Sequence, residues 1–165
     1  MGYSILLDLT SLQGRTPSVA SYLTARPSRD VRAAACQNIT ADWWDKRRSE
    51  FDLFISEIVV AEASRGNAEA ASRRLNALDG IPELRISDEA RALARAMLND
   101  GSFPPKAEID ALHVAVAAVN GIEYLLTWNC THIANAVMRP RIEQACRENG
   151  FEPPVICTPS ELLGA

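Results

Sequence analysis

Residues 108–129, EIDALHVAVAAVNGIEYLLTWN, carry the strongest indication of the fold. Apolar residues cover nearly the whole circumference of a helix over 111–119, which predicts a helix buried on all sides. Asn120 and Gly121 form a stop signal for that helix. The segment IEYLLTW (122–128) then predicts a short buried strand. A buried helix followed at once by a buried strand favours a parallel sheet covered by helices.

The rest of the chain repeats this alternation. Strands are expected in YSILLDL (3–9), FDLFIS (51–56) and PVICT (154–158), and PELRIS (82–87) is a short strand or an extended link. Helical patterns lie between them. We therefore predict an α/β protein, a three-layer α/β/α sandwich with a central parallel sheet. In such folds the site lies at the carboxyl ends of the strands.

The overall composition bounds the function. The 165 residues fit one domain over 1–165, and the net charge of −4 gives no general sign of nucleic-acid binding. The four cysteines form no C-x-x-C pair and no signal peptide is evident, which predicts reduced thiols and a cytoplasmic protein. The N-terminal apolar run is too short to span a membrane.

Four polar residues lie where the core pattern does not explain them. Asp8 ends the first expected strand, Glu62 lies inside IVVAEAS, Asp110 opens the buried helix, and Asn129 ends the strand YLLTWN. Each has a structural alternative. Asp110 could be a first-turn acid stabilised by the helix dipole, Glu62 could pair with Arg65, and Asp8 could form a turn.

Taken together, these residues indicate a metal site. They come from separate elements, each near the edge where the site of a parallel sheet forms. Converging carboxylates repel one another unless a cation holds them, and hard oxygen ligands suit Mg²⁺ or Mn²⁺. Such ions serve phosphodiester hydrolysis by activating water.

Three longer segments resemble one known family, the PIN-domain ribonucleases. They are FDLFISEIVVAEASRG (51–66), EIDALHVAVAAVNGIEYLLTWNCTHIAN (108–135) and PPVICTPSELL (153–163). The combination of D-A-L-H-x-A-x-A, a strand and LLTWN resembles the VapC-like toxin subgroup with a TWN ending, as does SYLTARPSRD (21–30). The resemblance covers essentially the whole chain.

The resemblance implies a site and a reaction. Asp8, Glu62 and Asp110 correspond to the three metal-binding acids, and Asn129 stands where many members have a fourth acid. Thr127 matches a small hydroxyl residue often found near it. The implied activity is metal-dependent RNA cleavage by a toxin that pairs with an antitoxin protein, and PIN proteins often form homodimers.

The chain departs from the family pattern at two places. Asn129 is neutral, so it could bind a cation through its carbonyl oxygen but adds no charge. The segment Thr16-Pro17-Ser18 stands directly before SYLTARPSRD, where relatives place an acid-Thr-Ser strand end. Either Asp8 is the first acid and a loop is inserted, or the strand ends near Thr16 and the first acid is lost. The apolar run before Asp8 favours Asp8.

Several accessory residues complete the predicted site. His113 and His132 could touch the site or the RNA, although a packed, hydrogen-bonded histidine is the simpler reading for His113. A zinc site from Asp110, His113 and His132 is a weak alternative, since the cysteines lack zinc spacing. Three arginines are candidates for RNA backbone contacts, namely Arg26, Arg29 and Arg139.

The sequence thus favours a Mg²⁺- or Mn²⁺-dependent endoribonuclease, the toxin of a toxin–antitoxin pair, with Asp8, Glu62, Asp110 and Asn129 as its catalytic residues. The alternative is a catalytically weak or inactive PIN-like module that binds RNA or a protein partner, because a fourth acid is missing. A receiver-like phosphoacceptor domain is disfavoured, since neither lysine follows an evident strand.

Overall fold

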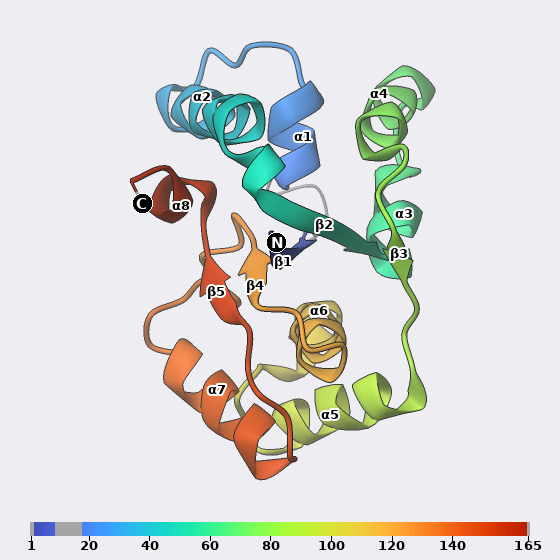
Figure 1. The fold of residues 1–165 in the computed structure, drawn as a ribbon, viewed down its shortest axis with the longest axis vertical. Helices are drawn as coiled ribbons and strands as arrows, with labels where there is room; N and C mark the ends of the chain where they lie inside the picture. Colours follow the sequence, from blue (N-terminus) through green and yellow to red (C-terminus); the bar gives the residue numbers. More distant parts are fainter. Residues whose placement is uncertain (1, 9–17, 165) are drawn as a thin grey trace.

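A computed structural model describes residues 2–8 and 18–164 of the chain. Five strands alternate with helices along it, as the sequence predicts (Figure 1). The strands are β1 (Tyr3–Leu7), β2 (Phe51–Ser56), β3 (Glu83–Leu84), β4 (Tyr124–Leu126) and β5 (Val155–Cys157). The helices are α1 (Val19–Thr24), α2 (Val31–Lys46), α3 (Glu57–Ala63), α4 (Ala68–Leu78), α5 (Asp88–Asn99), α6 (Glu108–Val119), α7 (Arg139–Glu148) and α8 (Pro159–Leu163), with 3-10 turns at Arg48–Glu50 and Pro105–Ala107.

All pairs of neighbouring strands are parallel, in the order β3-β2-β1-β4-β5. β1 is therefore the central strand, between β2 and β4. Its carboxyl end is fixed by a backbone hydrogen bond of 2.9 Å from the Asp8 N–H to the Leu126 carbonyl. This bond places Asp8 directly beside the segment that follows β4.

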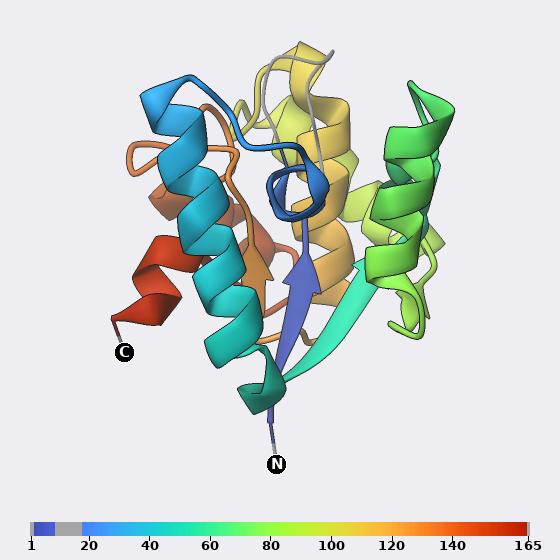
Figure 2. The same cartoon turned by 90° about the horizontal axis from the view of Figure 1, so that it is seen from above.

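The two faces of the sheet carry two separate apolar cores. Leu6, Leu125 and Ile156 pack with α5, α6 and α7 on one face. Ile5, Leu126 and Cys157 pack with α1, α2, α3, α4 and α8 on the other face. Adjacent residues of each strand thus serve opposite faces, as the pleat requires. Figures 1 and 2 show the two helical layers, which confirms the predicted three-layer α/β/α sandwich.

Helix α6 is buried as its apolar sequence predicts. Eight of its residues are buried, including Asp110 and His113. The helix ends at Asn120, and Gly121 follows with φ of +63°, in the left-handed region that glycine adopts without strain. The Asn-Gly stop is therefore confirmed, and the tight turn leads directly into β4.

The strands are shorter than the apolar runs that predict them. β1 ends at Leu7, so Asp8 is the first residue after the strand. β4 ends at Leu126, so Asn129 lies three residues beyond the strand rather than at its end. Thr16, the rival position for the first acid, lies outside the described residues. No helix among 2–8 and 18–164 is both long and apolar enough to cross a membrane.

Candidate active site

The candidate site lies where β1 and β4 end and α6 begins. Asp8 follows β1, and Asp110 lies in the first turn of α6, where the helix dipole favours an acid. Both acids are almost completely buried, with 1% and 0% of their surface exposed. In Figure 2, α6 begins at the end of the sheet toward which the strands point. The structure therefore brings these two predicted acids to the expected edge.

A chain of hydrogen bonds holds Asp8. The Thr127 hydroxyl donates to Asp8 Oδ2 at 2.5 Å, and the same hydroxyl oxygen accepts from the Asn129 N–H at 2.8 Å. The side-chain oxygen of Asn129 accepts from the His132 N–H at 3.1 Å. All four residues are buried. Thr127 thus orients the first acid and links it to Asn129, and both predicted residues lie at the site.

His132 holds the second acid. Its Nδ1 lies 2.7 Å from Asp110 Oδ2, the distance of a hydrogen bond from a ring N–H to a carboxylate. The histidine comes from the loop after β4, so this contact ties the loop to the start of α6. The sequence offered His132 as an accessory residue of the site or a contact for RNA, and the structure makes it the partner of Asp110.

His113 of α6 lies beside the first acid, Asp8. Its Nε2 is 3.5 Å from Asp8 Oδ1, and its side chain is fully buried. Neither ring nitrogen makes a hydrogen bond to another described residue. The ring is packed as expected, but the expected hydrogen bond is not found among the described residues, and Nε2 faces the Asp8 carboxylate instead.

The electrostatic environment raises the pKa of the Asp110 carboxyl above its ordinary value. Burial is the largest cause, because it penalises the charged form. The hydrogen bond from His132 acts in the opposite direction, the nearby Asp8 charge adds to the increase, and the Asn129 side chain lowers the pKa again.

Glu62 is placed by helix α3, which begins directly after β2, the strand beside β1. The residue is half-buried near the end of this seven-residue helix. Its helix therefore starts from the same edge of the sheet as Asp8. The assignment of Glu62 as the third acid of the site stays a prediction.

The three predicted RNA-contact arginines lie on two segments. Arg26 and Arg29 are exposed in the connection between α1 and α2. Figure 2 shows this connection at the carboxyl end of the sheet. Arg139 opens α7, and its Nη1 lies 3.4 Å from Glu161 Oε1. Their contact with RNA also stays a prediction.

One partly buried contact near the site could not be predicted from the sequence. The Trp128 indole N–H donates to the Thr40 hydroxyl at 2.8 Å, and Tyr22 packs edge-on against the Trp128 ring. These contacts attach the loop after β4 to α1 and α2. A threonine in the middle of a helix gives no reason to expect a partner 88 residues away.

The donor atoms of the site suit a hard cation, although the set is incomplete. Asp110 Oδ1 is buried without a hydrogen-bond partner among the described residues, so one carboxylate oxygen is available to a ligand. Within 2–8 and 18–164, however, no group of three or more His, Cys, Asp or Glu side chains is arranged to hold a metal ion. The zinc alternative is not supported, because His113 faces Asp8 while His132 holds Asp110.

The fold and the site define a class of protein, a parallel α/β sandwich with buried acids at the carboxyl edge of its central strand. Residues 18–129, more than half of the chain, match the model of the PIN domain family, and the chain belongs to that family. PIN domains are generally nucleases. The matched region contains Glu62, Asp110 and Asn129 and begins after Asp8.

A solved structure shares this fold. The crystal structure of VapBC2 from Rickettsia felis bound to a DNA fragment from their promoter contains a chain that superposes with a TM-score of 0.57. The match covers 94% of this chain and 98% of that chain, at 14% sequence identity. No curated protein resembles the chain closely enough in sequence to count as a relative.

Proposed function

We propose that the protein is a metal-dependent endoribonuclease that hydrolyses RNA phosphodiester bonds. The observation that supports this most is the convergence of buried Asp8 and Asp110 at the carboxyl edge of the sheet in a chain of the PIN family. Burial of two carboxylates without a cation is costly. Their retention at one edge therefore favours a ligand of positive charge.

The metal would be Mg²⁺ or Mn²⁺, held by Asp8, Glu62 and Asp110, with Asn129 assisting. When bound, such an ion lowers the pKa of water and neutralises charge on a phosphate. The chain itself supplies the positions of the acids. Thr127 fixes the Asp8 carboxylate, and His132 fixes Asp110 so that its Oδ1 faces away from the hydrogen bond.

RNA cleavage by the purified protein tests the proposal. With Mg²⁺ or Mn²⁺ present, wild-type protein should cut a mixed-sequence RNA, and Asp110→Asn should lower the rate at least about 100-fold. EDTA should abolish cleavage, and added Mn²⁺ should restore it. Asp79→Asn, an exposed position at the end of α4, is the matched control and should cleave normally. Cleavage that survives both Asp110→Asn and EDTA would overturn the proposal.

The biological role that fits this activity is the toxin of a toxin–antitoxin pair, with an antitoxin protein as partner. The fold shared with a chain of the VapBC2 structure supports this role. Induced expression in a bacterial host should arrest growth, whereas the Asp110→Asn variant should not. Equal growth with both proteins would contradict the toxin role and leave the nuclease test unaffected.

A second candidate is a catalytically weak module that binds RNA or a protein partner. Two observations favour it. Asn129 replaces an acid, and the Asp110 Oδ2 and Asp8 Oδ2 atoms are already engaged by His132 and Thr127. Titration calorimetry separates the candidates, because an active nuclease should bind Mn²⁺ with a Kd of about 1 mM or lower. Absence of heat at millimolar Mg²⁺ and Mn²⁺ would favour the module.

A further inference from the structure

The outer edge of β2 is only half covered by its neighbour. β2 runs from Phe51 to Ser56, but β3 pairs with Ile55 and Ser56 alone. On the other side, β1 pairs with β2 from Phe51 to Phe54. The first half of β2 is therefore an interior strand on one side and an edge strand on the other.

The register identifies the backbone groups that this edge exposes. The Ile55 N–H donates outward to the Pro82 carbonyl at 3.0 Å. Alternate residues of a strand direct both backbone groups to the same side, so the Leu53 N–H and C=O also face outward. Among the described residues, no backbone hydrogen bond reaches Leu53 from that side.

Pro82 explains why the β2–β3 ladder stops there. If the parallel pairing continued toward the start of β2, the next donor to the Leu53 carbonyl would be the N–H of residue 82. Proline has no N–H, so this bond cannot form. The chain instead turns away at Gly80 and Ile81, and the Leu53 groups stay open.

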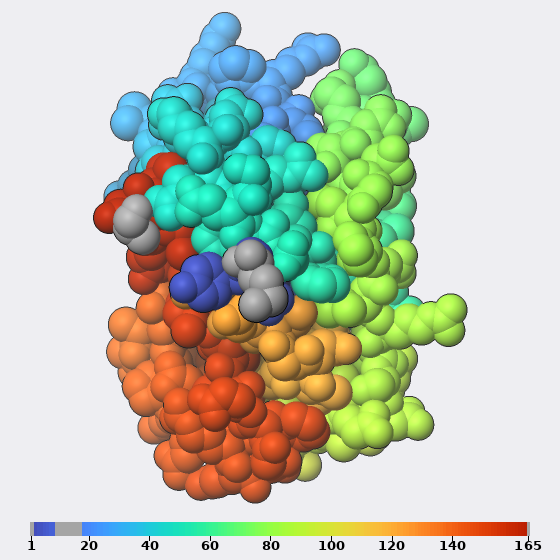
Figure 3. Space-filling view, in the orientation of Figure 1, coloured from blue at the N-terminus to red at the C-terminus, as the bar shows by residue number. Residues whose placement is uncertain are grey.

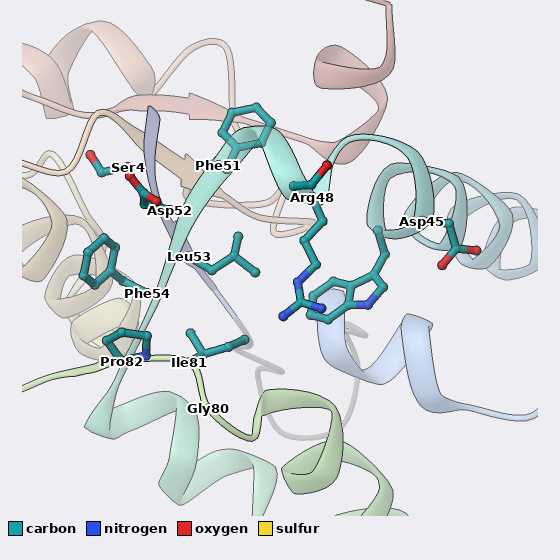
Figure 4. A pocket seen from close by; sticks show the side chains of 12 residues that line it. Ser4, Asp45, Arg48, Phe51, Asp52, Leu53, Phe54, Gly80, Ile81 and Pro82 are labelled. Carbon is teal, nitrogen blue, oxygen red and sulfur yellow. The ribbon is translucent and has the colours of Figure 1, made fainter. Parts of the chain in front are cut away.

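A pocket of about 760 Å³ borders this open edge. Figure 4 shows its side chains on both sides of the β2 ribbon. Ser4, Asp52, Phe54 and Pro82 lie on one side, and Leu53, Ile81 and Arg48 lie on the other. Leu53 and Phe54 are only half-buried, whereas Ile55 and Ser56, which pair with β3, are buried. An added strand would cover the first pair as β3 covers the second.

The charge on one side of the pocket favours a basic partner. Asp52 is exposed and forms no ion pair with another described residue. The Arg48 guanidinium lies 4.3 Å from the centre of the Trp44 ring, against the apolar side of the pocket. The Asp52 and Phe54 side therefore suits a lysine or arginine, and the Leu53 and Ile81 side suits an apolar residue.

We propose that the open edge of β2 is a docking site for an extended peptide segment of a partner protein, with alternating basic and apolar residues. The segment adds a strand to the sheet through the Leu53 backbone groups. Its basic side chains meet Asp52, and its apolar side chains meet Leu53 and Ile81. Strand addition of this kind combines backbone affinity with side-chain specificity. The surface lies at the opposite end of the strands from Asp8 and Asp110, so the proposal does not depend on the nuclease reaction.

Titration of the isotope-labelled full chain with a synthetic peptide, acetyl-(Lys-Val)₃-amide, tests the docking site by NMR. Binding with a Kd below about 1 mM is expected for so short a strand. The amide signal of Leu53 should shift, and its hydrogen exchange should slow at least tenfold. The acidic peptide acetyl-(Glu-Val)₃-amide should bind at least tenfold more weakly.

Two further peptides test strand addition without any change to the protein. One carries N-methyl groups on its lysine residues and the other on its valine residues. Only one set of peptide N–H groups can face Leu53, so one of the two peptides should lose binding and the other should keep it. Equal binding by both peptides would exclude a strand and overturn the proposal.

Protein variants test whether the Asp52 carboxylate attracts the lysine side chains of the peptide. Asp52→Lys should weaken binding of the Lys-Val peptide at least tenfold, while Glu148→Lys, an exposed position on α7, should not. No binding of the Lys-Val peptide at millimolar concentration overturns the proposal. Sedimentation that shows a dimer with Leu53 protected also overturns it, because the occupant would then be a second copy of the chain.

Discussion

The two ends of the sheet depart from the usual distribution of polar and apolar residues in opposite ways. The carboxyl end buries polar groups, since Asp8, Asp110, His113 and Asn129 are at most 2% exposed. At the amino end, the first residues of two strands are apolar and exposed, since Tyr3 of β1 is 56% and Val155 of β5 58% exposed. Figure 3 shows the first residues of the chain, in blue, on the surface of the amino end.

This difference teaches where the molecule can bind its ligands. Buried acids indicate a place where a cation can offset their desolvation. Exposed apolar side chains indicate a surface that another molecule can cover. The proposed reaction and the proposed docking site therefore lie at opposite ends of the same strands.

The largest expected effect concerns Trp43, which packs against Phe51 at the amino end of β2. Its ring is fully buried and packs against Phe51 at 5.9 Å and Trp44 at 6.3 Å. Trp43→Ala should lower the free energy of unfolding by about 3–5 kcal/mol, through lost contacts and a cavity. Urea unfolding measures this change. A loss below about 1 kcal/mol would show that the Trp43 ring does not pack in the core.

At the carboxyl end, removal of one hydroxyl should have a medium effect. Thr127→Val keeps the shape but leaves Asp8 Oδ2 without this donor. The free energy of unfolding should fall by about 1–3 kcal/mol, because a buried charged group loses a hydrogen bond. Thr131→Val, at an exposed position in the loop after β4, is the comparison substitution. Equal stability of Thr127→Val and wild type would show that the hydroxyl does not hold the acid.

The pH dependence of stability tests the raised pKa of Asp110. The folded protein holds the Asp110 proton more tightly than the unfolded chain, so stability is lost as pH rises from the ordinary value of 3.8 through the folded pKa. Asp110→Asn removes this loss. In thermal scans the variant should unfold at a higher temperature than wild type near about pH 7, and the difference should shrink toward about pH 4. A difference that grows toward acid pH would reverse the assigned direction.

The smallest effect is expected at the exposed ring of Tyr3. Its ring packs edge-on against Tyr124 at 5.7 Å but stays mostly exposed. Tyr3→Thr keeps a residue that favours strands and should cost less than about 1 kcal/mol. Urea unfolding of this variant beside Trp43→Ala compares surface and core at the same end. Similar losses for both would mean that the amino end is not an open surface.

The sequence predicted the layers of the fold from local patterns. The apolar run over 111–119 and the Asn-Gly stop predicted α6, and the apolar segment after them predicted β4. The strand ends were less certain, because an apolar run continues past the last ladder hydrogen bond. For this reason the sequence placed Asn129 at the end of the strand, whereas the residue lies three positions beyond β4.

The contacts of the site could not be predicted in the same way. The order of the strands places β4 beside β1, and this brings the Thr127 hydroxyl to Asp8 across 119 residues of sequence. The same strand order places His113 beside Asp8 and His132 beside Asp110. Nothing local in the chain predicts these two pairings, because each histidine meets an acid from a different element.

The sequence by itself determined the alternation of elements, the burial of α6 and the position of Asp8 after a core strand. These features depend on residue periodicity and on helix caps, which act over a few residues. Only the tertiary structure decided which groups meet: Thr127 with Asp8, His132 with Asp110, and Pro82 with the open half of β2. Such contacts depend on strand order and register, which are set by the packing of the whole sheet.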